Sequence, residues 1–219
     1  MTDSLLKGIG CNMAVRATKY FFPEECLVDL SFRLLQDPKA LTLAVGAICA
    51  HSQIIHPELL LKTVQSRNCD LNVIGAVLLK TNDRRFNKVI EYCKKKKFIS
   101  ERPIKILSFA FKIGQVAADK EFEQFGIQIS QLDPISEKKI TKIDLYLKNN
   151  LYIRNRLLFG CNWRADIIST IELGLNNPTQ IKNRLRCSYE TAHRVFNEYK
   201  LVERALNPSP FLTSRINVI

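Results

Sequence analysis

The stretch that decides the fold is residues 177–197, NPTQIKNRLRCSYETAHRVFN. Asn177 is a favourable N-cap residue, because its side chain can accept a hydrogen bond from a backbone N–H of the first helical turn. Pro178 suits the first position of a helix, where its missing N–H leaves no hydrogen bond unmade. Ile181 and Leu185 are four residues apart and therefore lie on one face. The pattern predicts a short amphipathic helix that begins at Pro178.

A second helix is predicted directly after the first. Cys187 and Ser188 interrupt the first helix, and the hydroxyl of Ser188 can cap the next one. The inward side of the second helix has three residues at helical spacing, Ala192, Val195 and Phe196. Two short helices joined by a tight turn, the second with a small residue facing the first, resemble a helix-turn-helix.

This resemblance rests on small or apolar residues at the positions where the motif keeps its core, namely Ile181, Leu185, Cys187, Ala192 and Val195. The sequence departs from the motif at Arg186, where the family often has glycine at the turn. In the motif, the second helix enters the major groove of DNA, and its outward residues contact the duplex. In this chain the outward residues are Ser188, Tyr189, Glu190, His193, Arg194 and Asn197.

The resemblance implies roles for these polar side chains. Arg194 and Asn197 would read bases, with His193 near them, since arginine can bond guanine and asparagine can bond adenine bidentately. Ser188 and Tyr189 would bond phosphate. The cations that would flank the DNA backbone are Lys182, Arg184 and Arg186. The alternative interpretation is two amphipathic helices with a solvated polar face, because such motifs also occur in folds that touch only protein.

The flanking sequence extends the resemblance to bacterial winged helix-turn-helix transcriptional regulators, over about residues 151–219. An Arg-rich approach and a Gly loop precede a predicted helix at residues 163–173, which ends at Gly174. The apolar face of that helix comprises Ile167, Ile168, Ile171 and Leu173.

The C-terminal residues have two interpretations. Residues 201–206 and 211–219, joined by a turn at residues 207–210, could form a β-hairpin. That hairpin would be the wing, and Arg204 and Arg215 would be its phosphate contacts. Alternatively, the apolar face of the second helix continues through Tyr199, Val202 and Leu206, and only the last segment is extended.

The charge balance favours polyanionic partners, chiefly nucleic acid. The chain has 33 basic and 21 acidic residues, a formal net charge of +12, and a pI near 9.5. Residues 151–219 carry a net charge of +5, and eight of their ten cations are arginine. Arginine suits bidentate contacts to bases and phosphates better than lysine does.

The seven cysteines indicate a reducing compartment. Their number is odd, no Cys-x-x-Cys occurs, and most lie inside apolar runs, so we expect free thiols that act as small core residues. The sequence has residues of the types that bind zinc at Cys49, His51, His56 and Cys69, but their spacing matches no common zinc pattern. We therefore expect no metal and no cofactor.

No signal peptide is visible, and the apolar run at residues 40–50 is too short to span a bilayer, so we expect a cytoplasmic protein without a membrane segment.

The N-terminal part is predicted to be all-α. Prolines precede most of its apolar runs, as is typical of the first turn of a helix. The predicted helices are at residues 23–36, 38–50, 57–66, 71–81, 83–97, 103–120, 134–149 and 151–159. Residues 1–22 are a weakly patterned leader, and residues 124–131 are a short strand or an irregular link. The predicted organisation is a helical domain at residues 1–132, a connecting helix at 133–150 and a winged helix-turn-helix at 151–219.

The sequence offers little support for an enzyme. It has no Gly-rich phosphate loop, no G-x-S-x-G and no His-Glu-x-x-His. Arg186 and His193 fit the spacing of the Arg and His of HEPN ribonucleases, but Arg186 lies at the turn and His193 is better explained on the exposed face of the second helix. A non-enzymatic alternative is more serious, because helical repeats followed by a winged helix resemble the PCI-type scaffolds of large complexes.

The sequence thus predicts a mainly α protein that regulates transcription by binding double-stranded DNA. We expect a homodimer, because one recognition helix contacts too few base pairs for useful specificity. The N-terminal domain could bind an effector, a partner protein or its own copy. A related alternative is an antitoxin-like regulator whose helical domain holds a protein partner.

Overall fold

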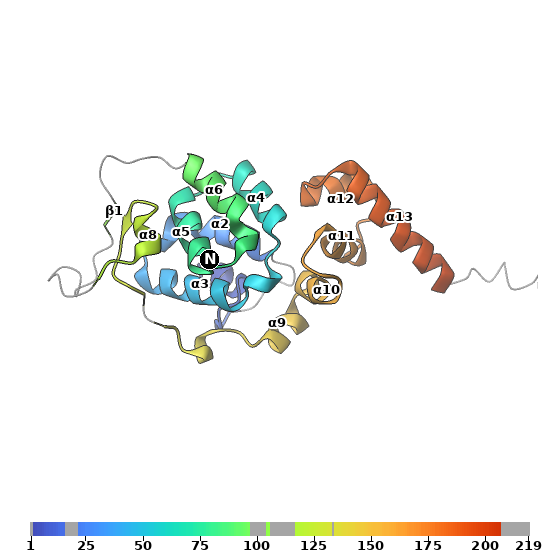
Figure 1. The fold of residues 1–219 in the computed structure, drawn as a ribbon. Helices are drawn as coiled ribbons and strands as arrows, with labels where there is room; N and C mark the ends of the chain where they lie inside the picture. The colour runs from blue at the N-terminus through green and yellow to red at the C-terminus, as the bar shows by residue number, and fades with distance from the viewer. Residues whose placement is uncertain (1, 16–21, 97–103, 106–116, 133, 207–219) are drawn as a thin grey trace, which may run out of the picture. The chain divides into compact units, whose positions relative to one another are not determined.

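The computed structural model describes residues 2–15, 22–96, 104–105, 117–132 and 134–206, and over these ranges the chain is mainly helical (Figure 1). The predicted mainly α character is confirmed. The chain divides into two compact units, Met1–Arg154 and Asn155–Ile219. None of the helices in the described ranges has the length and the apolar character needed to cross a membrane.

The N-terminal unit is built from short helices with brief connections. Its α-helices are α1 (Thr2–Gly8), α2 (Pro23–Leu34), α3 (Pro38–Ala50), α4 (Pro57–Ser66), α5 (Leu71–Lys80), α6 (Asn87–Lys96), α8 (Lys120–Glu123) and α9 (Ile143–Asn149). Three 3-10 turns join them, at Ser52–Ile54, Arg84–Phe86 and Glu137–Lys139. The next helix, α10 (Leu151–Phe159), begins in this unit and ends in the C-terminal one.

Local capping explains where these helices begin. Asp37 accepts hydrogen bonds from the backbone N–H groups of Lys39 and Ala40, at 3.0 and 3.1 Å, and Pro38 fills the first position of α3. Asp70 caps α5 in the same way. Each cap satisfies backbone donors that the helix itself leaves unpaired, which stabilises a helix start by about 1 kcal/mol.

The core of the N-terminal unit surrounds α5, which packs against α2, α3, α6 and α8. Val73, Ile74 and Val77 of α5 are fully buried. Gly75 of the same helix allows the Phe125 ring to approach closely, because a Cβ atom there would lie 2.1 Å from the ring atom Cε1. Each fully buried aliphatic side chain contributes about 1.5–3 kcal/mol, so this cluster is the main source of stability of the unit.

Two predictions for this unit are wrong. Residues 1–22 are not only a leader, since α1 (Thr2–Gly8) buries Leu5 and Leu6 in the core. The predicted helix at residues 103–120 is replaced at its start by strand β1 (Ile104–Lys105), which pairs in parallel with β2 (Ile127–Gln128). Of the two alternatives for residues 124–131, a short strand or an irregular link, the structure has the strand, at Ile127–Gln128. Residues 106–116 of the predicted helix lie outside the described residues.

The connecting helix predicted at residues 133–150 is also wrong. Of the described residues 134–150, only Glu137–Lys139, a 3-10 turn, and α9 are helical. Between them the backbone pairs with the chain near its N-terminus: Asn12 N donates to Lys139 O at 2.8 Å, and Thr141 N donates to Gly10 O at 2.8 Å. These bonds use backbone groups that a continuous helix would need for itself, so the helix is interrupted.

His51 lies at this junction, where α3 ends. Its Nε2 is 3.1 Å from the Thr141 carbonyl oxygen, and its ring centroid is 5.3 Å from that of Tyr146. Gly10 is required beside it for two reasons: its φ is +103°, and a Cβ atom there would lie 2.4 Å from His51 Cδ2. The imidazole is therefore enclosed between the N-terminal loop and α9.

This enclosure predicts that stability depends on pH. Burial lowers the pKa of His51, and the hydrogen bond to the Thr141 carbonyl opposes that effect only in part. The unfolded chain then binds a proton more readily than the folded chain as the pH falls below about 6.5. We expect the free energy of unfolding, measured with urea, to fall with decreasing pH in this range, by at most about 1.4 kcal/mol per pH unit for one proton.

The variant His51→Gln should show a smaller pH dependence than the natural sequence. His193→Gln is the matched control, because His193 is exposed. Equal slopes in all three proteins would show that His51 does not cause the effect.

The C-terminal unit contains the end of α10 and three further helices, α11 (Trp163–Glu172), α12 (Pro178–Leu185) and α13 (Tyr189–Leu206). The prediction that residues 201–206 form the first strand of a wing is wrong, because they belong to α13. These residues, LVERAL, are good helix formers, and Lys200 and Glu203 form an ion pair at 2.6 Å along the helix. The second strand of the predicted wing, with Arg215, lies outside the described residues.

Candidate nucleic-acid interface

Three helices, α11, α12 and α13, pack against one another in the C-terminal unit (Figure 1). Asn162 caps α11 by accepting from Ala165 N at 3.2 Å. Asn177 caps α12 by accepting from Thr179 N at 2.8 Å, as predicted. The sequence therefore fixes where two helices of the motif begin through short polar side chains next to their first turns.

The helix–helix contact of the motif has a core of small and apolar side chains. All five positions predicted to form its core are buried, namely Ile181, Leu185, Cys187, Ala192 and Val195. Phe196, also predicted to face inward, is half-buried, and the Lys200 ammonium lies 5.8 Å from the centre of its ring. The small side chain at Ala192 allows α13 to approach α12 closely, so the angle between the two helices is fixed by packing.

The turn between α12 and α13 depends on Arg186. Its backbone is left-handed, with φ 59° and ψ 26°, and its N–H donates to Lys182 O at 2.6 Å. Glycine adopts this conformation without a steric cost, whereas other residues pay about 1 kcal/mol or more. The departure from the motif at this residue therefore leaves the shape of the turn unchanged.

Arg186→Gly should keep the fold and change the free energy of unfolding by less than about 1 kcal/mol, because relief of the left-handed strain offsets the greater freedom of the unfolded chain. Arg186→Val removes the same side chain but adds a branched Cβ at positive φ, and should cost about 1–2 kcal/mol. Urea unfolding of the full chain measures both. An equal loss in the two variants would show that contacts of the Arg186 side chain, not the backbone conformation, govern the turn.

The exposed side of α13 carries an ordered row of polar side chains. Tyr189, His193 and Asn197 are four residues apart and lie one above another. The rings of Tyr189 and His193 stack, with centroids 5.6 Å apart and planes 25° apart. The amide nitrogen of Asn197 is 3.2 Å from His193 Nε2. We call these three residues the polar row.

Most of the predicted contact residues are exposed around this row. The exposed ones are Lys182, Arg184, Ser188, Tyr189, Glu190, His193, Arg194, Asn197 and Arg204. Arg186 is half-buried. Arg204 is ten residues beyond Arg194, which places it about 15 Å farther along the helix. Arg204 therefore lies beyond the polar row, near the end of α13.

Ser188 has a structural role that competes with the predicted phosphate contact. Its Oγ accepts a hydrogen bond from Thr191 N at 3.1 Å and lies 2.8 Å from Thr191 Oγ1. The predicted capping role is confirmed. The hydroxyl is held by the helix start, so it contributes less to a ligand than a free hydroxyl would.

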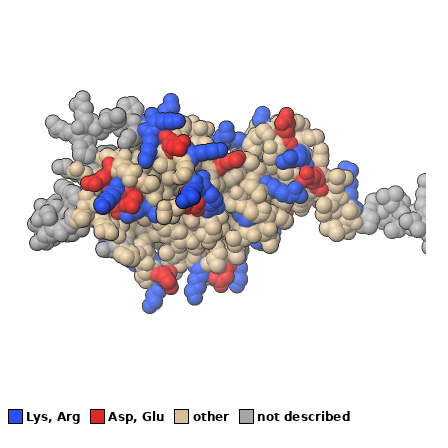
Figure 2. Space-filling model, viewed as in Figure 1, with Lys and Arg blue, Asp and Glu red and all other residues tan. Residues whose placement is uncertain are grey.

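Charge around the motif is basic but mixed. Arg164 on α11 pairs with Glu198 on α13 at 2.6 Å, which neutralises one acid of the second helix. Glu190 remains among the exposed residues at the start of α13. On the face drawn in Figure 2, Lys and Arg side chains lie over both units with Asp and Glu among them, so that face has no single basic patch.

Sequence reasoning missed a buried ion pair in this unit. Arg156 and Asp166 are fully buried and bond bidentately, Nε to Oδ1 at 2.7 Å and Nη2 to Oδ2 at 3.0 Å. Beside them, Asn155 donates to Ser169 Oγ at 3.0 Å and to Glu172 Oε2 at 2.7 Å. This network links α10 to α11. The sequence contains one indication that this carboxylate is buried, because Asp166 directly precedes the apolar residues of α11.

The candidates for metal or nucleophilic chemistry are the titratable side chains of the described ranges. No group of three or more His, Cys, Asp or Glu side chains there is arranged to hold a metal ion. Burial raises the pKa of the Cys11 and Cys93 thiols to about 12, so both stay protonated and are poor nucleophiles.

Comparisons with protein-family models, curated proteins and solved structures find no match for this chain.

Proposed function

We propose that the C-terminal unit binds double-stranded DNA through α13 and that the protein regulates transcription. The observation that carries this proposal is the polar row, exposed on a helix whose opposite side packs against α12 through buried small and apolar side chains. A recognition helix needs both properties, because its outward side chains must reach base edges while the helix keeps a fixed angle.

The roles follow from side-chain chemistry and position. Arg194 and Asn197 would contact bases, since both are exposed on the turns that follow the helix start. Tyr189 would bond phosphate, and its stacking on His193 limits the entropy lost on binding. The cations proposed to flank the DNA backbone are Lys182, Arg184 and Arg186.

A homodimer completes the proposal. Two copies would present their recognition helices about 34 Å apart on one face of the duplex and double the number of base pairs contacted. The helical N-terminal unit would carry the dimer contact, an effector site or a partner site. A cytoplasmic location belongs to the same proposal, because the regulators that the chain resembles are bacterial, and bacterial DNA lies in the cytoplasm.

A salt titration of the full chain with duplex DNA tests the proposal. Log affinity should fall linearly with log salt, with a slope of about −0.9 for each neutralised phosphate. Lys182→Gln should make the slope shallower by about one unit. Lys148→Gln, an exposed lysine of α9, is the control and should leave the slope unchanged. Absence of saturable binding at low salt would refute the proposal.

A second candidate, a protein-assembly scaffold, is favoured by one observation. Leu201, Val202 and Leu206, at the end of α13, are 64%, 57% and 76% exposed. Apolar side chains this exposed on one helix end are typical of surfaces that bind protein. A scaffold or an antitoxin-like partner protein would associate through this end without the salt-graded binding to duplex DNA described above.

A further inference from the structure

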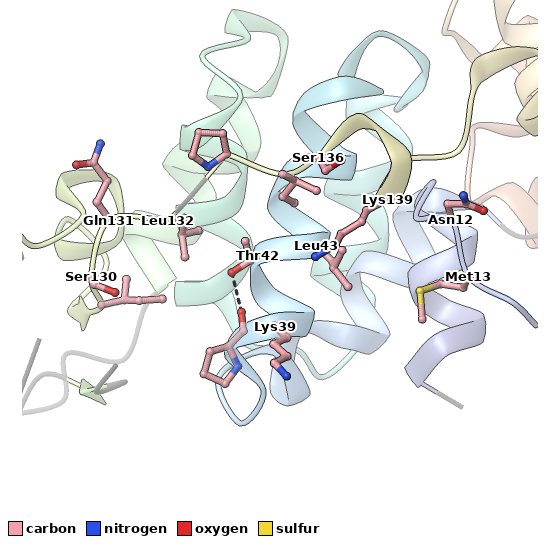
Figure 3. A pocket seen from close by; sticks show the side chains of 14 residues that line it. Asn12, Met13, Lys39, Thr42, Leu43, Ser130, Gln131, Leu132, Ser136 and Lys139 are labelled. Atoms are coloured by element: carbon pink, nitrogen blue, oxygen red, sulfur yellow. Dashed lines mark hydrogen bonds between the residues drawn. The ribbon is translucent and has the colours of Figure 1, made fainter. Parts of the chain in front are cut away.

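The N-terminal unit contains a cavity of about 580 Å³. One wall is the start of α3, and the other is formed by residues 129–132 and 134–139, which we call the strap (Figure 3). Asn12 and Met13 close a third side. The volume falls within the range of about 300–1,000 Å³ that is usual for small-molecule sites.

The strap is held in place at both ends. At its start, Asp119 N donates to Ile129 O at 2.9 Å, and at its end Asn12 N donates to Lys139 O at 2.8 Å. Because backbone hydrogen bonds fix both ends, the cavity is a formed feature of the fold and not a gap beneath a loose loop.

Ile135 fixes the middle of the strap against α3. A Cβ atom at Gly46 would lie 2.2 Å from Ile135 Cδ1, so the absence of a side chain at Gly46 lets Ile135 seat directly on the helix. This contact sets the distance between the strap and α3, and therefore the depth of the cavity beside it.

The cavity lining combines apolar walls with positive charge. The apolar contributors are Met13, Pro38, Leu43, Ile129, Leu132, Pro134 and Ile135. Among the described residues that line it none is acidic, whereas two are lysines, Lys39 and Lys139. Neither lysine ammonium has a hydrogen bond or an ion pair with any residue of the described ranges. Thr42, on the same wall, already donates its hydroxyl to Pro38 O at 2.8 Å.

The two lysines lie on opposite walls. Lys39 belongs to the first turn of α3, and Lys139 belongs to the strap, from which it reaches across toward Leu43 (Figure 3). Both side chains are exposed, and each ammonium would attract an anion bound in the cavity. The apolar walls would in turn favour a ligand that buries hydrocarbon, by about 25 cal/mol for each Å².

We propose that this cavity binds a small organic monoanion, a carboxylate with an apolar body. The carboxylate would lie between Lys39 and Lys139, and the apolar body would lie against Leu43, Leu132 and Ile135. An inorganic anion would bury no hydrocarbon against the apolar walls, and a neutral hydrocarbon would form no ion pair with the lysines. This assignment goes beyond the proposed DNA binding and does not depend on it.

Calorimetric titration of the full chain with octanoate tests the assignment. Octanamide, with the same chain but no charge, and inorganic phosphate, with charge but no chain, are the comparison ligands. We expect saturable binding of octanoate and binding of both comparison ligands that is weaker by roughly tenfold or more. Equal binding of octanoate and octanamide would overturn the assignment of a carboxylate, and absence of saturable octanoate binding would overturn the site.

Two variants locate the bound octanoate. Lys139→Gln should weaken its binding roughly tenfold, whereas Lys142→Gln, outside the lining, should not change it. Ser136→Trp should fill the cavity and abolish binding, with an unchanged unfolding midpoint because the Ser136 side chain is exposed. Octanoate binding that survives in Ser136→Trp would place the ligand elsewhere. No DNA is present in these titrations, so their failure would leave the proposed DNA binding untouched.

Discussion

Asp166→Ala should lower the free energy of unfolding of the C-terminal unit by about 3–5 kcal/mol. The change leaves the Arg156 guanidinium, which is fully buried, without the carboxylate that bonds it at 2.7 and 3.0 Å. A buried charge that loses its partner keeps its full cost of desolvation, and water cannot reach it in the native packing. Urea unfolding of the full chain, followed by circular dichroism, measures the loss.

Glu198→Ala is the matched control. It breaks the ion pair with Arg164, which is slightly shorter, at 2.6 Å, but the two side chains are 40% and 54% exposed. Exposed pairs contribute less than about 1 kcal/mol, so the two variants separate the effect of burial from the effect of contact distance. Losses of similar size would contradict the importance of burial.

The double variant Arg156→Met with Asp166→Leu adds a second test. Replacing a buried ion pair by apolar residues of similar volume is often neutral or stabilising, because no charge remains to be desolvated. We expect it to recover most of the stability lost in Asp166→Ala. Failure to recover would indicate that the neighbouring bonds of Asn155 to Ser169 and Glu172 depend on the ion pair.

Helix starts could be predicted from the sequence because their causes are local. Asp37 and Pro38, like Asn177 and Pro178, are adjacent in the chain, and each pair acts on the turn that follows it. The inward side of the helix-turn-helix was predictable for the same reason, since helical spacing alone places Ile181 and Leu185 on one face. The structure confirms both features.

Features that depend on distant partners were not predictable. Residues 134–149 have an amphipathic pattern suited to one helix, yet Lys139 and Thr141 pair with Asn12 and Gly10, about 130 residues earlier in the chain. Nothing in the local sequence shows that pairing. The prediction of a wing was wrong for another reason. The β-branched residues of the tail favoured a hairpin, but residues 201–206 are helical, in keeping with their own helix propensity.

The candidate site was predictable in outline and not in detail. Periodicity placed His193, Arg194 and Asn197 on the exposed side of α13, and the structure agrees. The stacking of Tyr189 on His193 depends on side-chain rotamers, which a pattern does not contain. Burial of Arg156 was missed because spacing identifies the face of a helix but not the depth at which that face lies.

Arg194→Ala should weaken binding to a preferred duplex by about 1–3 kcal/mol, which is roughly 5- to 150-fold. An arginine that bonds a guanine bidentately contributes to both affinity and base choice, so preference at one base pair should also relax. The preferred duplex is first selected from a random pool with the natural protein. Fluorescence anisotropy then compares the selected duplex with single-base substitutions of it.

Two further variants are the controls for this measurement. Lys182→Gln should weaken all duplexes about equally, since a phosphate contact does not depend on sequence. Arg204→Ala should change little, because Arg204 lies about 15 Å beyond Arg194 along α13, near the exposed leucines of the helix end. If Arg194→Ala instead lowered affinity uniformly and kept base preference, Arg194 would be a backbone contact. If only Arg204→Ala acted, the interface would lie at the end of α13, and base reading by the polar row and Arg194 would be wrong.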